Sequence, residues 1–193
     1  MGVIRQINWV DVFAIILFGR VCYIAVEKGF LSEIFKFFGT ILTIYLSLHY
    51  YTALGDLLSG RLGIKFIPLE FLDFLCFIFL SLVGYLFFIV VRQLFSRLFQ
   101  IKAVPYLSRW GGLALGIARG ILMVGLGVFM LAISSVTYLR ESAVNSYLGK
   151  RAIHIAPAVY GGIWNGLTSK FMPGEKFNQT VLEAQESQQK NQK

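Results

Sequence analysis

Charged and chemically reactive side chains are scarce in this sequence of 193 residues. Charged residues make up 15% of the chain, and there are two histidines, two cysteines and four prolines. Soluble domains average about 25% charged residues, so this composition is not that of an ordinary soluble domain. No Cys/His spacing suits a metal site, no nucleophile accompanies a base in a known signature, and no phosphate-binding glycine loop occurs. We therefore expect no enzyme, and no catalytic, metal or cofactor-binding residues.

The charges that are present are mostly basic. Lysine and arginine outnumber aspartate and glutamate 18 to 10, which gives a net charge of +8. Because basic residues cluster at the ends of apolar runs, anionic lipid headgroups explain them better than nucleic acid does. Arg20 is an exception inside the first run, where it either snorkels to the interface or lines a polar path. We expect a lipid bilayer with anionic headgroups as a partner, and no nucleic acid.

Long apolar runs dominate the rest of the chain. Hydrophobic residues reach 56%, and the mean hydropathy is +0.68. Four runs, at 10–26, 37–54, 74–91 and 110–139, approach or exceed the roughly 20 residues that a membrane-spanning helix needs. The sequence therefore predicts an all-α polytopic integral membrane protein with about four hydrophobic helices and further C-terminal amphipathic helices.

Two of these runs are not ideal membrane spans. Run 37–54 is short and has a polar side, so it is either a tilted helix or a re-entrant one. Run 110–139 would form a straight helix of about 45 Å, against a hydrocarbon thickness of about 30 Å. The economical arrangement is a helix broken near Arg119-Gly120, since discontinuous membrane helices occur where the freed backbone meets protein or water.

Composition divides the chain into three regions. Residues 1–140 contain the apolar runs and form the predicted membrane domain. Residues 141–172 interleave apolar and basic residues, which is typical of short amphipathic pieces lying on the bilayer or on a neighbouring subunit. Residues 173–193 are rich in Gln, Glu, Lys and Asn, which predicts a disordered polar tail.

The last apolar run carries a glycine stripe with two arginines on the same side of the predicted helix. These residues are Arg109, Gly112, Gly116, Arg119 and Gly120. Small residues four apart, as in a glycine zipper, let helices approach closely in lipid. An arginine on such a face is costly unless it meets an anion or water. The pattern has two interpretations, helix packing alone or a functional centre.

Acidic residues that could meet these arginines lie near the beginning of the chain. Asp11 falls in the first turn of the first run, where it either caps the helix or has a functional role. Lys28 and Glu33 flank Gly29 in a short polar hinge, and they either form an interfacial charge cluster or face the arginines. We expect Arg109, Arg119 and the glycine stripe to form the functional centre against Asp11 or Glu33, because an unpaired arginine at mid-membrane costs about 3 kcal/mol.

Three short motifs follow one another between residues 8 and 140. They are Asn8-Trp9-Val10-Asp11, then Lys28-Gly29-Phe30-Leu31-Ser32-Glu33, then Ser108-Arg109-Trp110-Gly111-Gly112 with Gly116 and Arg119-Gly120. In order and spacing they resemble the opening aromatic-x-Asp, the Arg-Gly-Phe-x-x-Glu hinge and the Asp-Arg-x-x-Gly-x3-Gly-x2-Arg/Lys-Gly stretch of the CvpA (colicin V production protein) family. The sequence departs from that pattern at Lys28, where the family has arginine, and at Ser108, where it has aspartate.

This resemblance implies a multi-pass protein of the bacterial inner membrane, associated with colicin V production or export and with envelope physiology. It implies no enzymatic activity. The function we expect is an oligomeric channel- or transporter-like component involved in toxin production or envelope homeostasis. The alternative is a non-conducting membrane scaffold for an export or envelope assembly. In either role we expect a homo-oligomer or a membrane partner protein.

Overall fold

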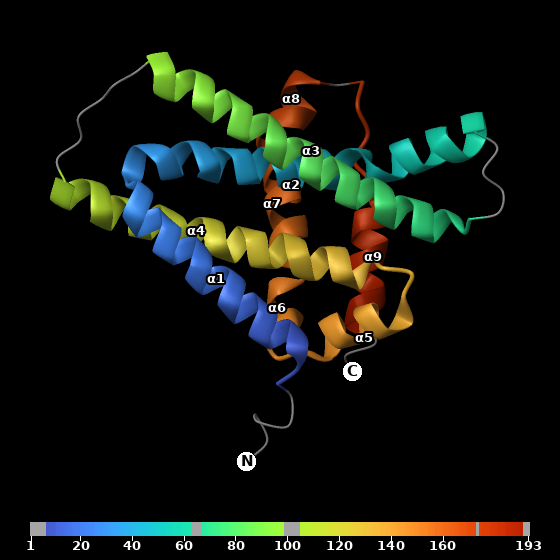
Figure 1. The fold of residues 1–193 in the computed structure, drawn as a ribbon. Coiled ribbons are helices and arrows are strands. Elements are labelled where there is room, and N and C mark those ends of the chain that lie inside the picture. The colour runs from blue at the N-terminus through green and yellow to red at the C-terminus, as the bar shows by residue number, and fades with distance from the viewer. Residues whose placement is uncertain (1–6, 63–66, 99–104, 173, 191–193) are drawn as a thin grey trace.

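The computed structural model describes residues 7–62, 67–98, 105–172 and 174–190, and the regular structure within these ranges is helical. In chain order the helices are α1 (Trp9–Lys28), α2 (Phe30–Leu62), α3 (Leu69–Leu98), α4 (Pro105–Ala132), α5 (Thr137–Asn145), α6 (Gly149–Ala152), α7 (Ile155–Ile163), the π-helical turn η2 (Trp164–Thr168), α8 (Ser169–Phe171) and α9 (Gln179–Lys190) (Figure 1).

Four of these helices are long and apolar enough to cross a membrane. The qualifying segments are Trp9–Lys28, Phe30–Arg61, Leu69–Val91 and Ser108–Ala132. Helices α1 and α3 run towards the end where α1 meets α2, and α2 and α4 run away from it (Figure 1). Helix α4 packs against both α1 and α2, and α3 packs on α2. The predicted all-α polytopic membrane fold is confirmed.

The predicted break in the last apolar run is wrong. Helix α4 continues without interruption through Arg119 and Gly120, and it ends at Ala132 rather than near Leu139. The turn that follows includes Ser134, whose hydroxyl accepts a hydrogen bond from the backbone N–H of Val136. The surplus length is thus removed at the C-terminal end, and α4 needs no mid-membrane break. Helix α2 is likewise continuous over 33 residues, so run 37–54 is part of one long helix.

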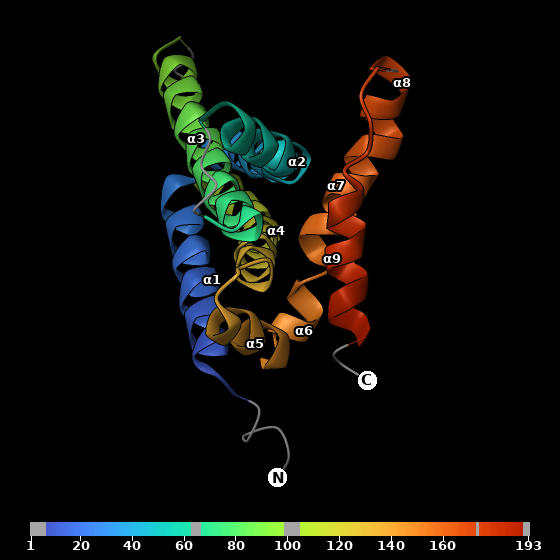
Figure 2. The ribbon, with the colours of Figure 1, turned by 90° about the vertical axis from the view of Figure 1, so that its right-hand side faces the viewer.

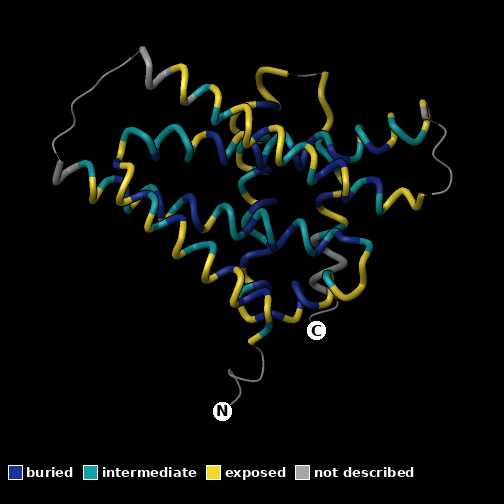
Figure 3. Tube along the Cα trace, viewed as in Figure 1, coloured by how far each residue is buried: buried dark blue, intermediate teal, exposed yellow. Residues whose placement is uncertain are grey.

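The C-terminal third packs onto the membrane helices as a second layer. Figure 2 shows α7, α8 and α9 lying beside α2 and α4, and Figure 1 shows α7 and α9 running across them. Segment 141–172 was expected to lie on the bilayer or on another subunit, and here α6 and α7 pack on α4 of the same chain. Figure 3 shows buried stretches of chain where this layer meets the bundle.

The region from residue 173 onward, expected to be a disordered tail, contains helix α9. Val181 on this helix is fully buried, and the ring of Phe177 lies 4.8 Å from that of Tyr160. The average composition of the tail is polar, but these two apolar side chains are four residues apart and provide enough contact to dock it. Residues 173 and 191–193 lie outside the described ranges.

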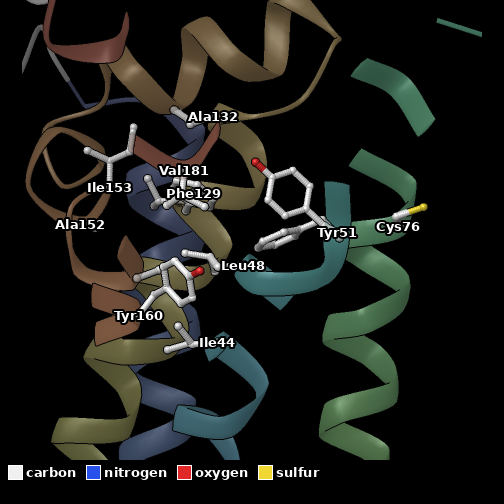
Figure 4. Packing of buried hydrophobic residues seen from close by; sticks show 14 of the residues in the cluster. Ile44, Leu48, Tyr51, Cys76, Phe129, Ala132, Ala152, Ile153, Tyr160 and Val181 are labelled. Atoms are coloured by element: carbon white, nitrogen blue, oxygen red, sulfur yellow. The ribbon is translucent and has the colours of Figure 1, made fainter. Parts of the chain in front are cut away.

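One hydrophobic core joins both layers. It contains Ile44, Leu48 and Tyr51 of α2, Phe129 of α4, Tyr160 of α7 and Val181 of α9 (Figure 4). Because these side chains come from segments far apart in the sequence, the C-terminal layer completes the core of the membrane domain rather than forming a separate unit.

Candidate functional site

The corner between α1 and α2 depends on Gly29. Its φ of 77° lies in the left-handed region, which residues with a side chain rarely adopt. A Cβ at this position would also clash with Ser108 Oγ at the start of α4. Ser108 Oγ accepts a hydrogen bond of 3.3 Å from the N–H of Phe30, and this satisfies a free donor in the first turn of α2. The hinge motif and the glycine motif therefore meet at this corner.

The glycine stripe of α4 is covered by α1. A Cβ added at Gly112 would lie 2.6 Å from the carbonyl oxygen of Ala25, and one at Gly120 would lie 2.8 Å from the ring of Phe18. At Gly116 an added Cβ would collide with the Cβ of Ala25. Close approach of this kind replaces the hydrophobic effect as the source of packing energy inside lipid. The stripe thus brings together two helices of the same chain.

Three charged side chains meet at the junction of α1, α2 and α4. Arg119 Nε lies 3.3 Å from Glu33 Oε2, and Lys36 Nζ forms an ion pair with Glu33 Oε1. Glu33 is 0% exposed and Arg119 is 5% exposed. We call these three residues the corner cluster. Of the two acids expected near Arg119, the structure brings Glu33 into contact with it.

Local helix geometry explains why the corner cluster forms. Glu33 lies in the first turn of α2, where the helix dipole favours a carboxylate. Side chains on a helix lean towards its N-terminus, so Arg119 on α4 is directed back towards the corner. The glycine stripe lets α1 and α4 approach closely enough to exclude lipid and water from this junction. Leaving a buried charge without any counter-ion costs about 3–5 kcal/mol, so Glu33, the one anion of the cluster, is the residue on which the arrangement depends most.

Asp11 lies far from the corner cluster and has another set of partners. Its Oδ1 accepts a 2.7 Å hydrogen bond from the N–H of Leu148, and its Oδ2 accepts from the N–H groups of Tyr147 and Asn8 at 3.2 and 2.9 Å. About 27 Å of helix separates it from the corner at Gly29. Asp11 therefore caps α1 and ties the turn between α5 and α6 to the same end of the bundle.

Lys28 and Arg109 are not part of the corner cluster. Both side chains are exposed at the end of the bundle where α1 meets α2. Arg109 lines a surface hollow together with Glu27 and Tyr23. Their position at a helix end, beyond the most apolar stretch, is typical of residues that reach a headgroup region.

A buried polar network joins α2 to the C-terminal layer, and sequence reasoning did not find it. His49 Nδ1 lies 2.9 Å from the hydroxyl of Tyr160, and His49 Nε2 lies 3.2 Å from Glu175 Oε2. Asn178 donates to the carbonyl of Leu48 at 2.8 Å. Burial raises the pKa of the Tyr160 phenol, although its hydrogen bond from the backbone of Asn178 acts in the opposite direction. No local signal could reveal this network, because His49 and Tyr160 are 111 residues apart.

Lys36 is the member of the corner cluster that the sequence analysis overlooked. Its spacing of three residues from Glu33 places both side chains on one face of a helix, and this signal was available from the sequence. Within the described ranges no group of three or more His, Cys, Asp or Glu side chains is placed to hold a metal ion. What the corner cluster can do is hold α2 and α4 together by charge, at the point where α1 packs on α4.

Comparison with known protein families gives one result that agrees with this geometry. The family model described as "Colicin V production protein" matches residues 10–157. The match includes Asp11, the corner cluster and the glycine stripe, and it extends past the turn that Asp11 binds. Searches of the curated proteins and of the solved structures found no match.

Proposed function

This chain belongs to the colicin V production protein family, and from that premise we propose that it acts in toxin production or envelope homeostasis as a non-conducting scaffold of the inner membrane. The observation that carries the proposal is the pairing of buried charges within one chain. Glu33 and Arg119 neutralise each other at the corner cluster, and Asp11 is held by backbone N–H groups. A conducting path would need such groups to face water.

The polar side of α2 is also used inside the chain. Ser47 Oγ lies 2.9 Å from Ser81 Oγ of α3, Thr43 donates to the carbonyl of Gly39, and His49 joins Tyr160. These side chains were the ones on α2 best suited to line a polar path. Because each has a partner within the protein, they support a packing role and leave little polar surface for transport.

The outward faces of α1 and α3 are mostly apolar, with Arg20 as a charged residue on α1. Exposed side chains on these faces include Phe13, Ile15, Ile16, Phe79, Leu82, Leu86, Phe87 and Val90. Such faces suit lipid or the helices of a membrane partner protein, including a second copy of this chain. A scaffold would use them to gather other components of an export or envelope assembly.

The channel- or transporter-like role is the alternative, and Arg20 is the observation that favours it. This arginine lies in the middle of α1 and is exposed on the outward face. Among the described residues it has no ion pair. In an oligomer it could contribute to a polar path between subunits, whereas in a scaffold it snorkels to the interface.

Flux measurements on purified full-length protein in liposomes separate the two roles. We expect ion flux equal to that of empty liposomes, with gramicidin as the positive control. Flux above that level, abolished by Arg20→Gln but retained by the exposed helix-end variant Arg61→Gln, would establish the channel-like role.

A second experiment tests the scaffold role directly, because a closed channel would also show no flux. We would place a photo-crosslinking residue in cells at Phe79, on the outward face of α3, and at the fully buried Phe77 as a control. We expect Phe79 to capture another membrane protein or a second copy of the chain. Capture of lipid alone, repeated at outward positions on α1 and α3, would contradict a scaffold.

A further inference from the structure

An apolar groove opens between the N-terminal half of α1, the C-terminal half of α4 and the short helix α6. Its volume is about 370 Å³, within the range of small-molecule binding sites. Ile15 and Phe18 line one wall, and Ile121 and Val124 line the other. Its lining side chains are apolar, with the single exception of Arg151.

Arg151 gives the groove a positively charged end. This side chain is exposed, and its guanidinium carbon lies 5.0 Å from the centroid of the Tyr147 ring, in cation–π contact. Lys150 precedes it on α6 and adds a second positive charge nearby. No acidic side chain lines the groove.

The charged end of the groove lies near aromatic side chains that are typical of a membrane interface. Helix α6 lies near the N-terminal end of α1 (Figure 1), where the rings of Trp9 and Tyr138 stack with a centroid distance of 6.4 Å. Aromatic side chains of this kind mark the headgroup level of a bilayer. The walls of the groove belong to α1 and α4, which are both long and apolar enough to cross a membrane.

We propose that the groove binds an acyl chain of an anionic phospholipid from the surrounding bilayer, with the lipid phosphate at Arg151. An almost wholly apolar lining offers no hydrogen-bonding groups that would orient a polar small molecule, but it suits a hydrocarbon chain. The guanidinium forms bidentate hydrogen bonds with phosphate, and two adjacent cations favour an anionic headgroup over a zwitterionic one. The inference depends on the membrane fold and is independent of whether the protein is a scaffold or a channel.

Native mass spectrometry of the full-length protein in detergent tests this assignment. The probes are phosphatidylglycerol and phosphatidylcholine with identical acyl chains. We expect tighter binding of phosphatidylglycerol, and we expect Arg151→Gln to weaken that binding about fivefold. Phosphatidylcholine should lose less, because its own choline cation already offsets the charge of its phosphate. Lys170→Gln, which removes an exposed cation on α8, is the matched charge control and should have no effect.

A second pair of variants tests the groove itself. Ile121→Trp places a large side chain in the groove and should reduce binding of both lipids. Ile117→Trp, one turn earlier on α4 and also exposed, lies outside the groove and should leave binding unchanged. The assignment is overturned if Arg151→Gln binds phosphatidylglycerol as the wild type does. It is also overturned if Lys170→Gln weakens binding as much as Arg151→Gln, or if Ile117→Trp weakens it as much as Ile121→Trp. If Ile121→Trp fails to fold, the Arg151→Gln and Lys170→Gln comparison decides alone.

Discussion

The corner cluster predicts an asymmetry between two substitutions that break the same ion pair. In Arg119→Gln, the buried carboxylate of Glu33 keeps its ion pair with Lys36. In Glu33→Gln, the guanidinium and the ammonium face each other with no anion between them. We therefore expect Glu33→Gln to destabilise the protein more than Arg119→Gln, although both remove the same contact.

The magnitudes follow from the geometry. Two charges 3.3 Å apart attract by about 5 kcal/mol at an effective dielectric constant of about 20, and desolvation offsets much of this attraction. Leaving a buried charge without its counter-ion costs about 3–5 kcal/mol, which we expect for Glu33→Gln. For Arg119→Gln we expect about 1–3 kcal/mol, because the glutamine can still donate a hydrogen bond and Lys36 remains.

The assay is reversible unfolding of the purified protein in mixed micelles of rising SDS content, followed by circular dichroism. Lys36→Gln is the control and should cost less than about 1 kcal/mol, because this side chain is partly exposed to solvent. The double variant Glu33→Gln/Arg119→Gln should be more stable than Glu33→Gln alone. Equal losses for the two single variants, or a larger loss for Arg119→Gln, would refute the view that Lys36 compensates the carboxylate.

Four further predictions concern the glycine stripe, the α5–α6 turn, the buried tyrosine and the role of the arginine. Gly116→Leu should abolish accumulation of the protein in membranes, because overpacking against α1 costs about 1–3 kcal/mol or more. The control Gly127→Leu has open space at Cβ, and its membrane abundance, measured by immunoblot, should be normal. Asp11→Ala should lower the free energy of unfolding by about 2 kcal/mol and make the α5–α6 turn more sensitive to limited proteolysis. Unchanged proteolysis of this turn would mean that the aspartate only caps α1. Because burial raises the pKa of Tyr160, the folded state binds the phenol proton more tightly than the unfolded state does. The free energy of unfolding should therefore fall as the pH rises from about 10 towards the raised pKa. In alkaline unfolding curves, Tyr160→Phe should remove this part of the fall. Arg119→Gln should insert into membranes yet fail to restore colicin V production in a complementation assay, and full activity at normal abundance would leave the arginine with a structural role only.

The helices themselves could be predicted from the sequence because their signals are local. Uninterrupted apolar runs identified four membrane helices, and the glycine between Lys28 and Phe30 marked the corner between the first two. The stripe of glycines indicated a close helix contact because an α-helix brings every fourth residue near to the same face. In these cases the residues that carry the signal are the ones that form the element.

Helix ends were less predictable. The run was counted to Leu139 although Ser134, Ser135 and Thr137 interrupt it, and α4 ends at Ala132, just before them. The end is set by the turn at Ser134 and by the packing of α5 on α4, which brings residues from another segment into contact with this one. A length argument applied to the run alone placed the interruption at Arg119-Gly120, where α1 in fact supports a continuous helix.

Partner choice was decided by tertiary structure alone. Asp11 and Glu33 are both carboxylates near helix starts, and only the pairing of antiparallel helices places one beside Arg119 and the other beside the α5–α6 turn. The contact between His49 and Tyr160 and the hydrogen bond from Asn178 to the carbonyl of Leu48 likewise depend on segments more than a hundred residues apart. A local pattern states which faces are apolar or charged, but which faces meet is determined by the free energy of the whole packed arrangement.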